Sequence, residues 1–110
     1  MQSIVKLVND DPIYFWISDG SAWMRVRGDA CLLNASRVKE FGREMIRRNI
    51  REFRVDLENC SGLDSTFMGT LAGIALRLRE LGDGSLRVLN APPEQEKQIR
   101  DLGLEKLFFD

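Results

Sequence analysis

The sequence predicts a single α/β domain, built from a mixed and mostly parallel β-sheet with helices packed on it. A strand–turn–strand pattern over residues 13–28 is followed by strands that alternate with helical patterns. Parallel strands need crossover connections, usually helices, so this alternation predicts parallel pairing in the second half. A chain of 110 residues, 44% of them hydrophobic, can bury one core, and no repeat or linker divides it. We therefore expect one domain over 1–110, with a lead-in at 1–11 and alternating helices and strands over 29–110.

The first pair of strands is predicted by residue type. Residues 13–17 are aromatic and β-branched, as is typical of a strand. Asp19-Gly20 then indicates a tight turn, because such turns need positive φ angles that glycine tolerates. Residues 22–27 form the partner strand, and we expect Gly28 to end it.

The later elements follow from capping residues and periodicity. Asn34 can accept hydrogen bonds from the free N–H groups of a first helical turn, so we expect it to cap a helix over 35–49. Period-two alternation and helical spacing predict the other elements. These are a strand over 53–57, a helix over 65–81, a strand over 85–90, a helix from Pro92-Pro93 to about Leu102, and an extended or helical segment over 104–109.

Composition excludes several classes of function. The net charge of -1 argues against binding to nucleic acid or membranes by bulk charge, and no apolar run is long enough to span a membrane. The absence of histidine removes Ser-His-Asp and Cys-His catalysis and histidine-ligated zinc. Cys31 and Cys60 are expected to be two free, buried thiols of a reducing compartment. We expect a cytoplasmic protein with no metal and no cofactor.

The informative segment is residues 57–71, where a strand ends and a helix begins. Asp64 is predicted to be the N-cap, and Ser65 the first helical residue. Free N–H groups and the helix dipole favour negative charge at this position, so it suits an anion or a phosphorylated serine. Gly69 and Gly73 continue from Ser65 at helical spacing. They form a flat strip on the helix, with Ala72 and Leu76 alongside.

Two readings of this strip remain open. The glycines either expose a docking surface or permit close packing against a neighbouring helix of the same domain. A catalytic serine is disfavoured, because residues 57–71 contain no lysine and no GxSxG elbow. We expect a protein that is not an enzyme.

Residues 63–71, Leu-Asp-Ser-Thr-Phe-Met-Gly-Thr-Leu, resemble the STAS family of bacterial anti-sigma factor antagonists, and the resemblance covers nearly the whole chain. It implies a STAS-like fold and a phosphorylation site at Ser65, with Thr66 as a secondary hydroxyl. It further implies a switch that is not an enzyme. The unphosphorylated form binds an anti-sigma factor with serine kinase activity, phosphorylation releases it, and a serine phosphatase restores binding.

This chain departs from the family pattern at two places. Phe67-Met68 replaces the usual Gly-Leu, and we expect Met68 to lie near the docking strip. Cys31 occupies a position that is often acidic, and Asp29 is the nearest acid. The predicted partner-binding residues are Asp29, Cys31, Asp64, Ser65, Thr66, Met68, Gly69, Ala72 and Gly73.

Alternative functions also fit the sequence. STAS-like domains accompany transporters and lipid-trafficking complexes, so a scaffold or regulatory subunit without Ser65 phosphorylation is the second reading. A nucleotide-binding module is the third, although Cys60-Ser61-Gly62-Leu63 is no P-loop. The basic run over 37–54 has interleaved glutamates, which predicts a solvated face with ion pairs of Glu40 and Glu44. Contact of this run with nucleic acid or an acidic partner is the weaker interpretation.

Overall fold

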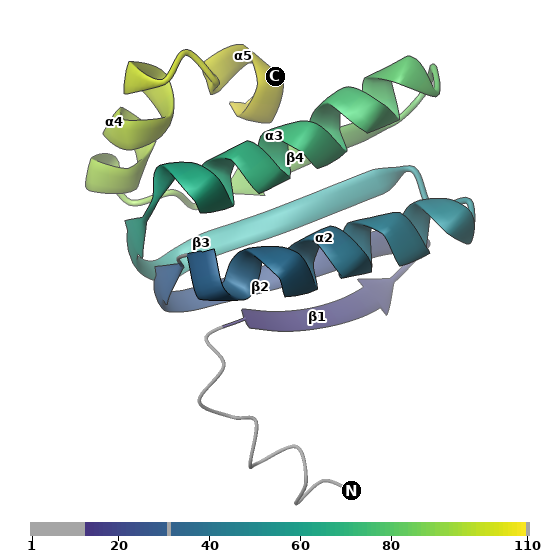
Figure 1. The fold of residues 1–110 in the computed structure, drawn as a ribbon, viewed down its shortest axis with the longest axis horizontal. Helices are drawn as coiled ribbons and strands as arrows, with labels where there is room; N and C mark the ends of the chain where they lie inside the picture. Colours follow the sequence, from purple (N-terminus) through teal and green to yellow (C-terminus); the bar gives the residue numbers. More distant parts are fainter. Residues whose placement is uncertain (1–12, 31, 110) are drawn as a thin grey trace, which may run out of the picture.

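A computed structural model describes residues 13–30 and 32–109 as one sheet with helices packed against it (Figure 1). The strands are β1 (Ile13–Ser18), β2 (Ser21–Ala30), β3 (Glu52–Leu63) and β4 (Ser85–Leu89), and the helices are α2 (Leu32–Arg47), α3 (Ser65–Glu80), α4 (Pro93–Asp101) and α5 (Glu105–Phe109). The sheet order is β1-β2-β3-β4, with β1 antiparallel to β2 and the other pairs parallel. The predicted mixed, mostly parallel sheet is confirmed. The predicted lead-in and Cys31 lie outside the described residues.

The hairpin between β1 and β2 has the predicted turn but a longer second strand. Asp19 and Gly20 both have positive φ angles, of 50° and 79°. Gly28 does not end β2, as the sequence predicted; it has a φ of 71°, and the strand continues to Ala30. The register with β3 shifts between Gly28 and Asp29, and such an irregularity lets a strand bend and continue pairing.

β3 is more than twice as long as predicted, because its second half pairs with the end of β2. Asp29 lies opposite Gly62, and Ala30 opposite Leu63. Asn59, Ser61 and Gly62 have the composition of a loop, so the sequence alone did not indicate this extension. The consequence is that the end of β2 lies beside the residues that lead into α3.

Helices α2 and α3 lie side by side on one face of the sheet (Figure 1). The alternating residues Phe53, Val55 and Leu57 of β3 are fully buried, as the period-two pattern of this strand requires. The start of α2 corrects one expectation: because the helix begins at Leu32, Asn34 is its third residue and not its N-cap. Leucine favours helix more than asparagine does, which suits the earlier start.

The C-terminal helices close the domain beside β4 and α3. Pro93 occupies the first turn of α4, where its missing N–H costs little, as predicted. The terminal segment left open by the sequence is helical; in α5, Phe108 is fully buried and the helix contacts β4 and α3. None of the helices in the described ranges is long and apolar enough to cross a membrane.

The sheet face turned away from α2 and α3 is called the outer sheet face, and its central side chains interact with one another. The rings of Trp16 and Trp23 stack across β1 and β2 with centroids 5.6 Å apart. The guanidinium of Arg25 lies 5.2 Å from the centre of the Trp16 ring, and its Nε donates to Asp56 Oδ2 at 3.2 Å. Asp56 is only 5% exposed, although it alternates with the apolar residues that face the helices.

Candidate functional site

The N-terminus of α3 has the capping geometry that the sequence predicted. Asp64 is extended, with φ −98° and ψ 168°, and its Oδ1 accepts a hydrogen bond of 2.7 Å from the N–H of Phe67. Ser65 follows as the first helical residue, and it is exposed. A capped helix leaves other first-turn N–H groups without helical partners, so an anion on Ser65 lies where the backbone favours negative charge.

The glycine strip of α3 is open to solvent. Gly69 and Gly73 are exposed, and a methyl group added to either would meet no heavy atom within 4 Å. Leu76, on the same side of the helix, is 53% exposed. The two glycines therefore do not serve close packing against a helix of this domain, which was one of the two readings of their spacing.

Close packing between α2 and α3 instead depends on Gly42, a residue that the sequence analysis did not single out. A methyl group added to Gly42 would lie 2.6 Å from Cδ1 of Ile74. Gly42 has no partner at helical spacing within α2 that would have marked it as a contact. Its role follows only from the way the two helices meet.

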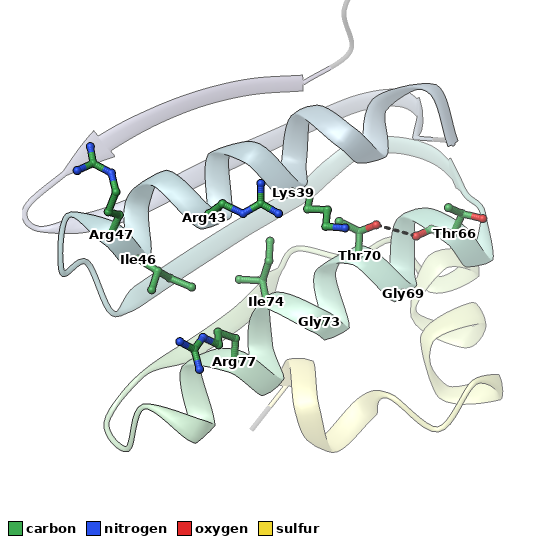
Figure 2. Close-up of a pocket in the computed structure, with 11 residues that line it drawn as sticks. Lys39, Arg43, Ile46, Arg47, Thr66, Gly69, Thr70, Gly73, Ile74 and Arg77 are labelled. Atoms are coloured by element: carbon green, nitrogen blue, oxygen red, sulfur yellow. Dashed lines mark hydrogen bonds between the residues drawn. The ribbon is translucent and has the colours of Figure 1, made fainter.

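A groove of about 790 Å³ runs along the junction of α2 and α3 (Figure 2). Ile46 and Ile74 project into it from the two helices, and the backbone of Gly69 and Gly73 forms part of its wall. Its remaining lining residues are Lys39, Gly42, Arg43, Arg47, Thr66, Thr70 and Arg77. The site thus combines an apolar floor with four cationic side chains.

The cations of the groove differ in how they are paired. Arg47 and Arg48 bind Glu44 at 2.7 and 2.9 Å, and their hydrogen bonds lower the pKa of Glu44 to about 2. This pairing of Glu44 was predicted. Lys39 and Arg43 form no ion pair within the described ranges, so the predicted pair between Glu40 and Arg43 is absent there.

Arg77, the cation contributed by α3, pairs with a carboxylate on its own helix. Its Nη1 lies 3.1 Å from Oε1 of Glu80, and both side chains are largely exposed. Such an exposed pair is weak and exchanges readily with solvent or with another carboxylate.

Two threonines line the end of the groove nearest Ser65. The hydroxyl of Thr70 donates to the carbonyl of Thr66 at 3.0 Å (Figure 2). Thr66 is exposed, as a secondary modification site would require. The predicted contact residue Ala72 is half-buried beside the glycine strip.

Asp29 lies beside the loop that leads to Ser65. Its Oδ1 accepts a hydrogen bond of 3.1 Å from the hydroxyl of Ser61, and a methyl group on Gly62 would lie 2.7 Å from the same oxygen. An acid at the end of β2 is therefore held next to the N-terminus of α3. Cys31, which was also predicted to contact the partner, lies outside the described residues.

Met68 corrects a sequence-based expectation. It is 3% exposed and belongs to the core, so it does not lie on the docking strip. It shares a flank of α3 with Arg79, whose guanidinium donates to the carbonyl of Lys106 in α5 at 3.2 Å. That flank of α3 contacts α5 at Arg79, and the sequence did not indicate that Met68 would be buried on it.

Cys60 is a free, buried thiol, as predicted. Burial raises its pKa, and its Sγ donates to the carbonyl of Gly62 at 3.3 Å. Within the described part of the chain, no three cysteine or carboxylate side chains gather to hold a metal ion.

Comparisons with known proteins identify the family and the fold of the chain. Residues 15–109 match the family model described as "Mlab, STAS domain". The structure of the Bacillus cell fate determinant SpoIIAA in its phosphorylated form is similar, with a TM-score of 0.71 and 19% identity over 89% of each chain. An anti-sigma factor antagonist from Mycobacterium paratuberculosis gives a TM-score of 0.70 at 19% identity, covering 87% of this chain and 80% of that one. A comparison with curated protein sequences finds no match.

Proposed function

The chain belongs to the STAS domain family, and we propose that it is a protein-binding switch, an anti-sigma factor antagonist controlled by phosphorylation of Ser65. The observation that carries the proposal is the exposed hydroxyl of Ser65 at the capped N-terminus of α3, directly beside an open strip of glycines. The hydroxyl is accessible to a kinase, and the strip is accessible to a partner. The proposed protein is a binding module and not an enzyme.

In its unphosphorylated form, the proposed switch binds an anti-sigma factor that is also a serine kinase. During phosphorylation, Ser65 Oγ attacks the γ-phosphorus of ATP, the bond from that phosphorus to the β–γ bridging oxygen breaks, and ADP leaves. The hydroxyl proton passes to a base of the kinase. A serine phosphatase restores the hydroxyl by adding water to the phosphoserine and releasing inorganic phosphate.

The electrostatic effect of phosphorylation is local. A phosphate adds roughly -1.5 to -2 charges at a helix N-terminus, which tolerates them, so α3 stays folded. A partner that docks over Ser65 would remove water from this phosphate, which costs free energy. An acidic partner surface would also be repelled by the phosphate charge. A loss of about 4 kcal/mol weakens binding about a thousandfold, and no rearrangement of the fold is required. The similarity of this chain to SpoIIAA structures in both unphosphorylated and phosphorylated forms supports a switch of this kind.

Substitutions at Ser65 test the proposal directly. Ser65→Glu should abolish co-purification with the anti-sigma factor, whereas Ser65→Ala should preserve it. Ser18→Glu, which adds the same charge at an exposed position at the end of β1, is the matched control and should bind like the parent chain. If Ser65→Glu binds as tightly as the parent, the switch does not operate at Ser65.

A second candidate function is favoured by the length of the groove. The groove extends from Thr66 to Arg77, well beyond Ser65, so a partner can contact it without touching the hydroxyl. A scaffold or regulatory subunit of a transporter or lipid-trafficking complex would use it in this way. Incubation of the chain with ATP and the co-purified partner, followed by mass spectrometry of the Ser65 peptide, separates the two functions, because a scaffold stays unphosphorylated.

A further inference from the structure

We infer that the groove between α2 and α3 receives an acidic, amphipathic helix of the partner protein, a conclusion that rests on the proposed binding function and names the chemistry of its partner. Ser65 lies at one end of this binding surface. The groove forms the rest of it and provides its apolar floor and its positive charge. The shape of the groove, its apolar floor and its charge each favour such a helix.

The shape of the groove suits a helix. Its α2 wall runs from Lys39 to Arg47, nine residues that span about 12 Å of helix, and its α3 wall from Thr66 to Arg77 is about 16 Å long. Two or three turns of a partner helix match this length. Gly69 and Gly73 leave open space on the α3 wall, so the backbone of a partner helix can approach closely.

The floor of the groove is apolar and only partly covered by this chain. Ile46 is half-buried at the junction of the helices, and Ile74, which lines the groove from α3, is 7% exposed. Apolar side chains at helical spacing on a partner would cover these groups, as in other complexes in which a helix lies in a groove. This requirement makes the partner segment amphipathic.

The charge of the groove makes the partner segment acidic. Lys39, Arg43 and Arg47 recur every four residues along α2, so they form a row on one side of the groove. Arg77 faces this row from α3 (Figure 2). Lys39 and Arg43 have no carboxylate partner among the described residues, and same-sign neighbours cannot satisfy one another. Glutamates or aspartates spaced four apart on a partner helix complement this row.

Site-specific photo-crosslinking in the cells that produce the chain tests the inference. A p-benzoylphenylalanine at Thr70 places the probe in the groove, and the same residue at Tyr14, which is 41% exposed on the outer sheet face, is the matched control. Mass spectrometry of the Thr70 product should identify a segment with apolar residues at helical spacing, flanked by acids. The double variant Lys39→Glu, Arg43→Glu should reduce its yield at least about tenfold, whereas Arg87→Glu, on the outer sheet face, should change it less than about twofold.

Three results would overturn the inference: no product at Thr70, a product whose segment is neutral or basic, or a yield that the double variant leaves unchanged. Binding of the purified chain to phosphatidylglycerol vesicles that the double variant abolishes would also overturn it, since the groove would then take a membrane surface.

Ser65→Glu separates this inference from the proposed function. An acidic segment that still crosslinks in Ser65→Glu refutes the switch and leaves the groove assignment intact. A non-acidic segment that is lost in Ser65→Glu refutes the groove assignment and leaves the switch intact.

Discussion

The outer sheet face and the α2–α3 groove both expose arginines, but their side chains are satisfied in opposite ways. On the outer face, Arg25 lies over Trp16 and pairs with Asp56. In the groove, Lys39 and Arg43 have no ion pair within the described residues. Exposure alone therefore does not mark a binding surface. Side chains that already contact one another, such as Arg25 and Asp56, contribute to stability. Lys39 and Arg43 lack a carboxylate partner in the described residues and are available for binding, although Arg47 and Arg77 of the same groove pair with glutamates of their own helices.

The difference has a geometric origin. Neighbouring strands place opposed side chains close together, so residues far apart in sequence can complete one another's contacts. Asp56 shows this, because it accepts hydrogen bonds from Arg25 of β2 at 3.2 Å and from the amide of Asn90, which follows β4, at 3.3 Å. Its Oδ1 also accepts a local hydrogen bond of 2.9 Å from the N–H of Glu58. Cations four residues apart on one helix are neighbours of the same charge and cannot pair with one another. Their carboxylate partners must be nearby glutamates of the same helix or groups of another molecule.

The largest expected effect is at Asp56. Asp56→Ala removes a buried acceptor from three donors, so we expect the free energy of unfolding to fall by about 2–3 kcal/mol, with groove binding unchanged. Urea denaturation measures the loss. Glu52→Ala is the matched control, because it removes an exposed ion pair with Arg54 from the same strand and should cost less than about 1 kcal/mol. Equal losses in the two variants would mean that the outer face is not a stabilising network.

A pair of glycine substitutions should give smaller effects of opposite sign. Gly42→Ala places a methyl group against Ile74 and should lower the free energy of unfolding by about 1–2 kcal/mol. Gly73→Ala meets open space in a helix interior and should raise it by roughly 0.5–1 kcal/mol. Thermal unfolding of the two variants provides the measurement. Destabilisation by Gly73→Ala would show that the strip is packed, contrary to its role as a free surface.

The smallest expected effect is a dependence on pH. Burial alone would raise the pKa of Asp56, but the hydrogen bonds from Glu58, Asn90 and Arg25 lower it below the ordinary value of 3.8. The Asp56 carboxylate therefore makes its full contribution to the free energy of unfolding at pH values above 3.8. This contribution is lost as the pH falls through the lower pKa of the folded state. The difference in stability between the parent and Asp56→Asn should shrink on acidification below about pH 4. A difference that stays constant with pH would contradict the assignment.

The sequence predicted the parts of the site that depend on local chemistry. Asp64 caps α3 because an aspartate side chain reaches the N–H three residues later, and this needs no tertiary information. The alignment of Ser65, Gly69 and Gly73 follows from helical periodicity in the same way. The roles of these residues in binding stay predictions that the proposed substitutions test.

The parts that the sequence could not predict depend on contacts between distant segments. Met68 is buried in the core although it follows the exposed residues Ser65 and Thr66, and nothing near residue 68 in the sequence indicates that burial. Asp56 alternates with apolar neighbours, which predicts an exposed carboxylate until Arg25 and Asn90 are brought beside it. Gly42 likewise acquires its role only when Ile74 arrives from the other helix.

The burial of sulfur has a consequence for how the surface responds to oxidative stress. Met24, Met45, Met68 and Cys60, the sulfur-bearing side chains within the described ranges, are each at most 5% exposed. Peroxide reaches buried thioethers slowly, and a buried thiol with a raised pKa offers little reactive thiolate. The strip and groove contain no sulfur, so oxidants that damage exposed methionines elsewhere in a cell would leave this docking surface chemically unchanged.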